Sequence, residues 1–386
     1  MVQPRRVAVM GVTGSIGRQS LDVLRRSPQF ELVAVSAGRR VEELVSVVRE
    51  FRVPRVGVPD DVSATRVRDE CGDAVEVVVG DEGLAELSAD ADVVVNAVVG
   101  FAGLPVTLAT LLAGRRLALA NKESLIAAAP LVEGVRSTPG AEIWPVDSEH
   151  CALHQCLVGS SPVPRHPDVE RLWITASGGP FRGYDATQLD GVSRDEALRH
   201  PTWQMGPKIT VDSSTLMNKG LEVLEASALF GVEVERIGVV VHPQSIVHSM
   251  VEYVDGSVLA QLSAPDMRLA IAYCLGAPER LDHHWGQLDF SSGFRLDFEP
   301  PDRVNFPALD LAYACARRGG AAPAWMSAAN EVAVEAFLDG RLAWREIVPL
   351  VASTLESYDD SPLESVAHLR DEDARARAVA HGNLPQ

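Results

Sequence analysis

Short β-branched runs alternate with helical patterns from residue 6 to residue 147, and this rhythm restricts the possible folds more than any other feature of the sequence. The apolar runs are Val7–Met10, Leu32–Val35, Val75–Val79, Val93–Val99, Leu117–Ala120 and Ile143–Val146. Helices with apolar residues at helical spacing are predicted at Ile16–Arg26 and Val41–Phe51. Strands that alternate with helices build a parallel sheet from βαβ units. Residues 1–147 are therefore predicted to form a doubly wound, Rossmann-like α/β domain.

The rhythm becomes irregular after Asp147. The predicted elements are a strand at Leu172–Thr175, a helix from about Thr215 to Phe230, a strand at Val239–Val241, and a hairpin at Val251–Leu262 with a type I′ turn at Asp255-Gly256. This mixture favours a second, α+β catalytic domain at residues 148–280. Residues 281–303 show little periodicity and contain two adjacent prolines, which favours a linker.

Helical patterns return in the last part of the chain. They lie at Ala324–Leu338, Trp344–Ser357 and Glu364–Val379. Residues 304–386 are therefore predicted to form a small C-terminal helical bundle.

The composition excludes several classes of function. A formal net charge of −18 opposes binding to nucleic acid and to anionic membranes, because both need a positive field on the protein. An anionic metabolite remains compatible, since a few basic residues can make a cleft locally positive. The 5 cysteines form no Cys-x-x-Cys pair, which favours a reducing compartment. Without a signal-peptide core or an apolar segment of about 18 residues, the sequence predicts a cytoplasmic protein.

A glycine-rich turn and an arginine pair predict a dinucleotide site. Gly11 to Gly17 reads G-V-T-G-S-I-G, follows the first strand and opens a helix, where glycines and helix amides can hold a pyrophosphate. A plain tight turn is the alternative. After the second strand, where NAD sites carry an acid, stand Arg39 and Arg40. Two arginines suit a 2′-phosphate and favour NADP, unless they are only solvated charges at a helix start.

Carboxylates in two segments predict a metal site. Asp147 and Glu149 follow an apolar strand, and if the strand continues, alternation places both on one side, where they can bind Mg²⁺ or Mn²⁺. Exposed acids near a turn are the alternative. Asn218, Lys219 and Glu222 can face one cleft from a predicted helix, with Glu222 as a third metal ligand. A surface Lys–Glu ion pair is the competing interpretation.

Two further segments favour ligand contacts. Ser177-Gly178-Gly179 resembles an anion-holding turn. His200 to Gly206, bounded by Pro201 and Pro207, is predicted to be a loop that either closes over a ligand or packs as an irregular core segment. His150 and His154 stand at the spacing of a zinc pair, but no third soft ligand completes the set, so they are predicted at a helix surface.

Together these segments resemble the 1-deoxy-D-xylulose 5-phosphate reductoisomerase family over nearly the whole chain. The shared motifs are T-G-S-I-G at 13–17, N-K-E at 121–123, D-S-E-H at 147–150, S-G-G-P-F at 177–181, H-P-T-W-x-M-G at 200–206, L-M-N-K-G-L-E at 216–222, H-P-Q-S-I-V-H-S-M at 242–250 and A-A-N-E at 328–331. Their order and spacing make the resemblance specific.

The resemblance implies a role for each matching residue. Cofactor contacts are expected from Thr13, Gly14, Ser15, Ile16, Gly38, Arg39, Arg40, Asn121, Glu123 and Gly206. Metal ligands are expected at Asp147, Glu149 and Glu222. Substrate contacts are expected from Lys122, Ser148, Glu149, Ser177, His200, Ser213, Asn218, Lys219 and Glu222, with the phosphate held mainly by Ser177, Ser213, Asn218 and Lys219. Catalytic roles are expected for Lys122, Glu149, His200 and Trp203, the last in a mobile flap.

The activity implied by the resemblance is that of an NADPH-dependent reductoisomerase of the non-mevalonate isoprenoid pathway. It would convert 1-deoxy-D-xylulose 5-phosphate to 2-C-methyl-D-erythritol 4-phosphate with Mg²⁺ or Mn²⁺, by retroaldol and aldol steps or by a direct 1,2 shift, followed by reduction. The resemblance also implies a homodimer. The alternatives are an NADP-linked sugar-phosphate dehydrogenase, which would need no metal for a skeletal rearrangement, and a non-catalytic NADP-binding sensor.

Overall fold

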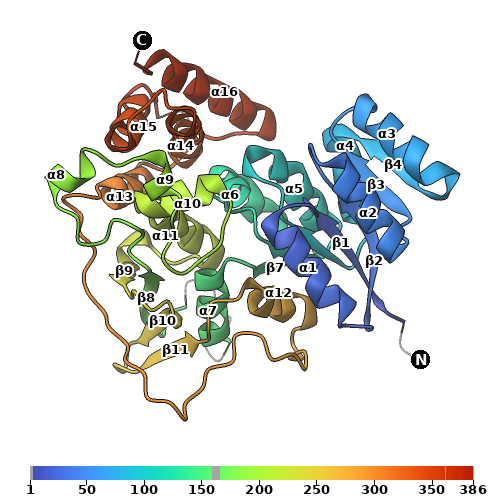
Figure 1. Ribbon diagram of the computed structural model, residues 1–386, viewed down its shortest axis with the longest axis horizontal. Helices are drawn as coiled ribbons and strands as arrows, with labels where there is room; N and C mark the ends of the chain where they lie inside the picture. The colour runs from blue at the N-terminus through green and yellow to red at the C-terminus, as the bar shows by residue number, and fades with distance from the viewer. Residues whose placement is uncertain (1–2, 159–165, 361, 386) are drawn as a thin grey trace. The chain divides into compact units, whose positions relative to one another are not determined.

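A computed structural model describes residues 3–158, 166–360 and 362–385, and the chain divides into two compact units (Figure 1). The first unit contains the chain up to Leu125, Val132–Cys151 and Asp266–Gly286, and the second contains Ile126–Leu131, Ala152–Pro265 and the chain from Gln287. The sequence assigns residues 266–286 to the catalytic domain and the linker, but this segment packs in the first unit. The domain boundaries given above stay a prediction.

Within the described residues, seven parallel strands form the sheet of the first unit, in the order β4-β3-β2-β1-β5-β6-β7. Their bounds are β1 Arg5–Met10, β2 Phe30–Ser36, β3 Arg55–Val58, β4 Glu76–Val79, β5 Val93–Asn96, β6 Arg116–Leu119 and β7 Glu142–Pro145. Because the strand order reverses between β1 and β5, the sheet is doubly wound, and the fold-class prediction is confirmed. Val7, Val9 and Val95 are fully buried, as expected for strands covered on both faces.

Strand β3 is absent from the sequence prediction. It has four residues, lies between Pro54 and Pro59, and begins with Arg55, which forms ion pairs with Glu76, Glu86 and Asp90. A short segment that starts with a charge and is flanked by prolines lacks the apolar run that marks a buried strand.

Helices surround the sheet of the first unit. In chain order they are α1 Ser15–Arg25, α2 Val41–Phe51, α3 Asp61–Cys71, α4 Gly80–Ala89, α5 Leu104–Leu112 and α12 Met267–Gly276, while the residues of α6 Lys122–Arg136 and α7 Ser148–Leu157 are divided between the two units. Helix α12 packs against α1, β6 and β7. Its side chains Ile271, Cys274 and Leu275 are fully buried in the same apolar cluster as the strand valines. A segment distant in sequence therefore completes the core of this unit.

The second unit contains a smaller mixed sheet in the order β11-β10-β8-β9. Its strands are β8 Val169–Ala176, β9 Ile237–Val241, β10 Val247–Tyr253 and β11 Val258–Leu262. The predicted hairpin forms, but the type I′ turn is wrong. A type I′ turn needs a positive φ at both central residues, but of Asp255 and Gly256 only Gly256 has one. The Gly256 N–H donates to Tyr253 O (2.8 Å), so the two arms are joined by a longer loop with a glycine bulge.

The second unit also contains helices. They are α8 Ala186–Leu189, α9 Arg194–Ala197, α10 Pro207–Ser214, α11 Met217–Phe230, α13 Ala308–Arg318, α14 Ala322–Leu338, α15 Ile347–Glu356 and α16 Val366–Gly382. Helices α14, α15 and α16 lie side by side (Figure 1) and bury Trp325, Ile347 and Ala376. This confirms the predicted C-terminal helical region. Among the described residues, no helix is both long and apolar enough to cross a membrane.

All five cysteines are free thiols, as the sequence predicts. Burial raises the pKa of the Cys156 thiol to about 11 and that of Cys315 to about 12. Because the thiolate is the reactive form, these cysteines are packing residues.

Candidate active site

The glycine-rich turn lies where the strand order of the first sheet reverses. Gly11 follows β1 with φ +84°, and a Cβ there would lie 2.4 Å from the carbonyl oxygen of Ala97, which follows β5. Gly17 is equally confined, because its Cβ would lie 2.4 Å from Val12 O. Glycine is therefore required for the turn to approach β5 and for α1 to begin at Ser15, with its N-terminal amides beside the crevice where such sheets bind ligands.

The arginine pair follows β2 on the same edge of the sheet. Both side chains are exposed. Arg40 lies 3.4 Å from Glu43, whereas Arg39 forms no hydrogen bond or ion pair with any described residue. Arg39 is therefore the more available of the two charges for an anionic ligand.

Asn121 and Lys122 stand at the start of α6. The Asn121 side chain caps this helix through Ser124 N (3.1 Å) and donates to Val98 O (2.7 Å) and Gly100 O (2.8 Å). Because these bonds occupy its amide, Asn121 shapes the loop after β5. The Lys122 ammonium lies 2.7 Å from an Asp147 carboxylate oxygen, and both side chains are almost fully buried.

Asp147 lies in the turn between β7 and α7, so the argument from strand alternation is wrong: β7 ends at Pro145. Asp147 instead accepts hydrogen bonds from the N–H groups of Glu149 (3.1 Å) and His150 (3.4 Å), so it caps α7. Burial by itself raises the pKa of the Asp147 carboxyl, but Lys122 and His150 outweigh burial and hold this pKa well below its usual range. The Asp147 carboxyl is therefore ionised at neutral pH.

His150 is buried, so its predicted place at the helix surface is wrong. Its Nδ1 lies 2.9 Å from Asp147 Oδ1. His154 is half-buried. The spacing of Asp147 and His150, three residues apart at a helix start, is the sequence signal that points to this contact.

In the second unit, His200 joins two serine hydroxyls. Its Nε2 lies 3.0 Å from Ser177 Oγ and 3.1 Å from Ser213 Oγ. Its Nδ1 accepts from the backbone N–H groups of Trp203 (2.9 Å) and Thr202 (3.2 Å), so in the neutral ring Nε2 carries the hydrogen. Three hydrogen-bond donors thus converge from segments distant in sequence, an arrangement suited to an anion.

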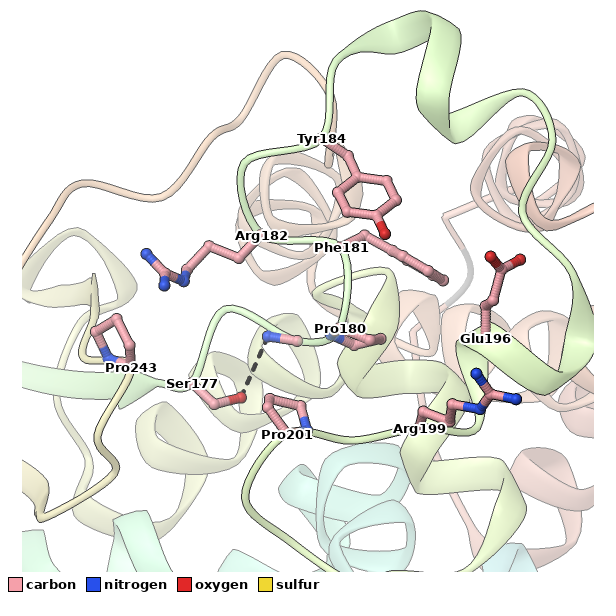
Figure 2. A pocket seen from close by; sticks show the side chains of 10 residues that line it. Ser177, Pro180, Phe181, Arg182, Tyr184, Glu196, Arg199, Pro201 and Pro243 are labelled. Carbon is pink, nitrogen blue, oxygen red and sulfur yellow. Dashed lines mark hydrogen bonds between the residues drawn. The ribbon is translucent and has the colours of Figure 1, made fainter.

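The turn at Ser177 has the backbone of an anion-holding loop. Gly178 and Gly179 have φ values of +87° and +71°, and Gly179 N donates to Ser177 Oγ (3.2 Å; Figure 2). This turn borders a cavity of about 450 Å³ whose lining includes Ser177, Arg182 and Arg199 (Figure 2).

Gly179→Ala is expected to raise KM for a phosphorylated substrate and to lower stability by about 2–5 kcal/mol. The left-handed φ strains alanine, and its Cβ would lie 2.6 Å from Ser213 O. KM and thermal unfolding check this. Gly183→Ala is the matched control, because Gly183 has φ +83° but nothing within 4 Å of a Cβ. It should lower stability by about 1–2 kcal/mol and leave KM unchanged. Equal KM values for the two variants would contradict the prediction.

Asn218, Lys219 and Glu222 meet on one face of α11, as their spacing predicts. Asn218 Nδ2 donates to Glu222 Oε1 (2.5 Å), and Lys219 Nζ donates to Glu222 Oε2 (2.5 Å). Glu222 is 1 % exposed and Lys219 5 %, so the interpretation as a surface ion pair is wrong. Two nearly buried charges and an amide fit a binding site better than a solvated helix face.

Residues 201–206 form neither helix nor strand, as predicted. Trp203 in this loop packs against the His248 ring, with 6.0 Å between centroids, and Gly206 caps α10. The Trp203 indole is only half-buried. The loop therefore presents an apolar side chain next to the convergent donors of His200, Ser177 and Ser213.

Lys208 is a polar residue near these groups that the sequence analysis missed. Its ammonium lies 2.9 Å from the buried Asp212 carboxylate. The sequence contains only 3 lysines, Lys122, Lys208 and Lys219, while arginine supplies every other basic side chain of this type. Each of the three pairs with a carboxylate at most 11 % exposed. Lysine scarcity is thus the signal that would have identified Lys208.

Comparisons with known proteins identify the family. Residues 7–129 match the 1-deoxy-D-xylulose 5-phosphate reductoisomerase family, residues 143–230 match its C-terminal domain, and residues 262–379 match the DXP reductoisomerase C-terminal domain. A 1-deoxy-D-xylulose 5-phosphate reductoisomerase of Xanthomonas axonopodis is 50 % identical over 387 residues, which cover 99 % of this chain and 97 % of the relative. The chain belongs to the 1-deoxy-D-xylulose 5-phosphate reductoisomerase family. The resemblance predicted from the motifs is confirmed.

Relatives and solved structures of the reductoisomerase family agree with this assignment. The Chlorobaculum tepidum enzyme is 48 % identical over 359 residues, covering 92 % of this chain and 93 % of its own. The Zymomonas mobilis enzyme in complex with NADPH has a TM-score of 0.90 and 40 % identity, covering 98 % of this chain and 99 % of its own. A reductoisomerase in complex with NADPH, fosmidomycin and magnesium has a TM-score of 0.92 and 38 % identity, with 98 % coverage of both chains.

Proposed function

We propose that the chain catalyses the NADPH-dependent conversion of 1-deoxy-D-xylulose 5-phosphate to 2-C-methyl-D-erythritol 4-phosphate, with a divalent metal ion, in non-mevalonate isoprenoid biosynthesis. Membership of the reductoisomerase family, with family models matching residues 7–129, 143–230 and 262–379, carries this proposal. Solved relatives described as complexes with NADPH and with magnesium support both cofactors.

The proposed metal ligands are Asp147, Glu149 and Glu222. All three are carboxylates, the hard oxygen donors that Mg²⁺ and Mn²⁺ prefer. The low pKa of Asp147 supports the assignment, because a ligand must be deprotonated. Ser148 Oγ donates to Glu149 (2.5 Å) and so restricts the Glu149 carboxylate.

The proposed phosphate site consists of Ser177, Ser213, Asn218 and Lys219. The hydrogen bonds of His200 to both serines support it, because they bring the hydroxyls of two separate segments together. Lys219 adds a positive charge inside a protein of net charge −18. Binding energy from the phosphate orients the reacting end of the substrate and favours closure of the loop that carries Trp203.

The reacting end of the substrate is assigned to Lys122, Ser148 and Glu149. A bound metal ion would polarise the ketone and hydroxyl oxygens of the substrate, and bound NADPH would supply the hydride that reduces the rearranged aldehyde. Lys122, held by Asp147, presents an ammonium that stabilises negative charge or donates a proton at those oxygens. The role proposed for Trp203 is to exclude water from the bound substrate.

NADPH is assigned mainly to the glycine-rich turn and to the segments after β2 and β6. The contacts proposed are with Thr13, Gly14, Ser15, Ile16, Gly38, Arg39, Arg40, Asn121, Glu123 and Gly206. Arg39 is exposed and has no hydrogen bond or ion pair among the described residues, which supports recognition of a 2′-phosphate.

Arg39→Ala is expected to weaken NADPH binding by roughly 10-fold or more, with little effect on NADH, because a charged hydrogen bond to the 2′-phosphate is lost. Arg40→Ala should have a smaller effect, since Glu43 already neutralises part of its charge. Dissociation constants for both nucleotides, measured by fluorescence, check this order. An unchanged ratio of NADPH to NADH affinity in both variants would place 2′-phosphate recognition elsewhere.

The decisive experiment follows NADPH oxidation with 1-deoxy-D-xylulose 5-phosphate after chelator treatment, with and without added Mg²⁺ or Mn²⁺. Metal-dependent oxidation that yields the branched polyol phosphate is the expected result. Oxidation without metal and without rearrangement would favour a sugar-phosphate dehydrogenase. NADPH binding without any oxidation would favour a sensor.

We further infer a cytoplasmic homodimer. The edge strand β11 supports dimerisation, because Val258 and Leu259 are 51 % and 50 % exposed and an unpaired edge can add a second copy. Light scattering should give twice the chain mass of 41.5 kDa, and Val258→Lys should lower it.

A further inference from the structure

Two buried side chains of the C-terminal helical region hydrogen-bond to α10 on either side of Ser213. Asn330 of α14 donates Nδ2 to Asp212 Oδ1 (2.8 Å), and Trp344 donates Nε1 to Ser214 Oγ (2.8 Å). Asn330 and Ser214 are fully buried, Asp212 is 1 % exposed and Trp344 5 %. The residues before and after Ser213 are therefore both held from the same region.

Trp344 also contacts the segment that carries Ser177. Its ring packs edge-on against Phe181, with 5.2 Å between centroids, and Phe181 ends the S-G-G-P-F motif. That motif already lies close to α10, because Gly179 is tightly packed on the Ser213 carbonyl. One indole therefore supports both segments whose hydroxyls meet at His200.

The hydrogen bond from Asn330 ends on a buried charge, the Asp212 carboxylate. One oxygen of the Asp212 carboxylate accepts the hydrogen bond from Asn330, and the other forms an ion pair with the Lys208 ammonium, 2.9 Å away. A buried carboxylate needs such partners, because removing one leaves an uncompensated polar atom. Asp212 is thus restrained from within α10 by Lys208 and from α14 by Asn330.

We propose that Asn330 and Trp344 are positioning residues that set the separation of the Ser177 and Ser213 hydroxyls and so determine affinity for the substrate phosphate. This rests on the proposed function of the two serines. The C-terminal helices then act on substrate binding as well as on stability, although neither residue is assigned a contact with substrate.

Trp344→Phe tests this with the smallest structural change, since phenylalanine keeps an aromatic ring against Phe181 but removes the indole N–H. The expected result is a rise in KM for the phosphorylated substrate of roughly five-fold, with kcat changed less and NADPH affinity unchanged. The constant for competitive inhibition by inorganic phosphate should rise in parallel.

Trp325→Phe is the matched control. Trp325 is also buried in the helical region and donates its indole N–H, but to Glu372 of α16 (2.6 Å) and not to a residue of α10. It should lower the melting temperature without changing KM or phosphate inhibition. If Trp344→Phe behaves like Trp325→Phe, losing stability alone, the positioning role is overturned.

Two further variants separate the possible failures. Asn330→Ala should raise KM and the phosphate inhibition constant as Trp344→Phe does, and an unchanged KM in both would overturn the proposal. Ser213→Ala measures the phosphate site directly. If Ser213→Ala leaves KM unchanged, the proposed phosphate site itself is wrong; if it raises KM while the two distal variants do not, only the positioning role fails.

Discussion

Glu222→Gln is expected to reduce turnover by about 1,000-fold or more while NADPH affinity changes little, because the proposed divalent-metal site would lose one of its three carboxylates. The amide can still accept a hydrogen bond from Lys219, so α11 should keep its fold. It cannot balance the Lys219 charge or hold a cation as a carboxylate does. The loss should therefore appear in metal binding and in kcat.

The measurement combines steady-state kinetics with Mn²⁺ titration of the metal-free protein. Glu335→Gln, an exposed position on α14, is the control for the same chemical change outside the site and should behave like the unmodified protein. Near-normal turnover of Glu222→Gln at low metal concentration would refute its assignment as a metal ligand.

Lys122→Met is expected to lower kcat by about 100-fold, the usual contribution of a group that moves a proton or stabilises developing charge. Methionine keeps most of the side-chain volume but leaves no ammonium 2.7 Å from Asp147. Without that charge the pKa of Asp147 rises, although His150 still contacts the carboxylate.

Lys122→Arg provides the comparison, since it restores the charge with a different shape and should recover part of the rate. Rates at saturating metal and substrate, together with the NADPH dissociation constant, separate a chemical defect from a binding defect. A Lys122→Met enzyme within three-fold of the normal kcat would remove Lys122 from the chemistry.

The sequence predicts those parts of the fold that have a strong local pattern. The strand at Val7–Met10 and the helix at Val41–Phe51 are continuous apolar or periodic segments, and both form. Residues Arg55–Val58 are too short and too polar at one end for such a pattern, so β3 depends on its neighbours β2 and β4. The Asp255-Gly256 turn shows the same limit, because turn type depends on how the two arms pair.

The candidate site is predictable where its residues share one helix. Asn218, Lys219 and Glu222 follow helical spacing, and their hydrogen bonds form accordingly. The burial of His150 was not predictable, because the sequence does not specify what packs around α7. The bonds from Asn330 and Trp344 to α10 join residues 118 and 130 positions apart, and no periodicity carries information over that separation.

Helix α12 belongs to the first unit although it is synthesised after most of the catalytic segment, and this affects folding during translation. The valine-rich strands emerge from the ribosome early, but Ile271, Cys274 and Leu275 complete their core only after a further stretch of about 115 residues, from Cys151 to Asp266, which takes roughly 6–23 s at ordinary translation rates. During that interval the nascent nucleotide-binding sheet exposes the apolar surface that α12 later covers. Chaperone capture of ribosome-bound chains should therefore be strongest before residue 286 has left the exit tunnel.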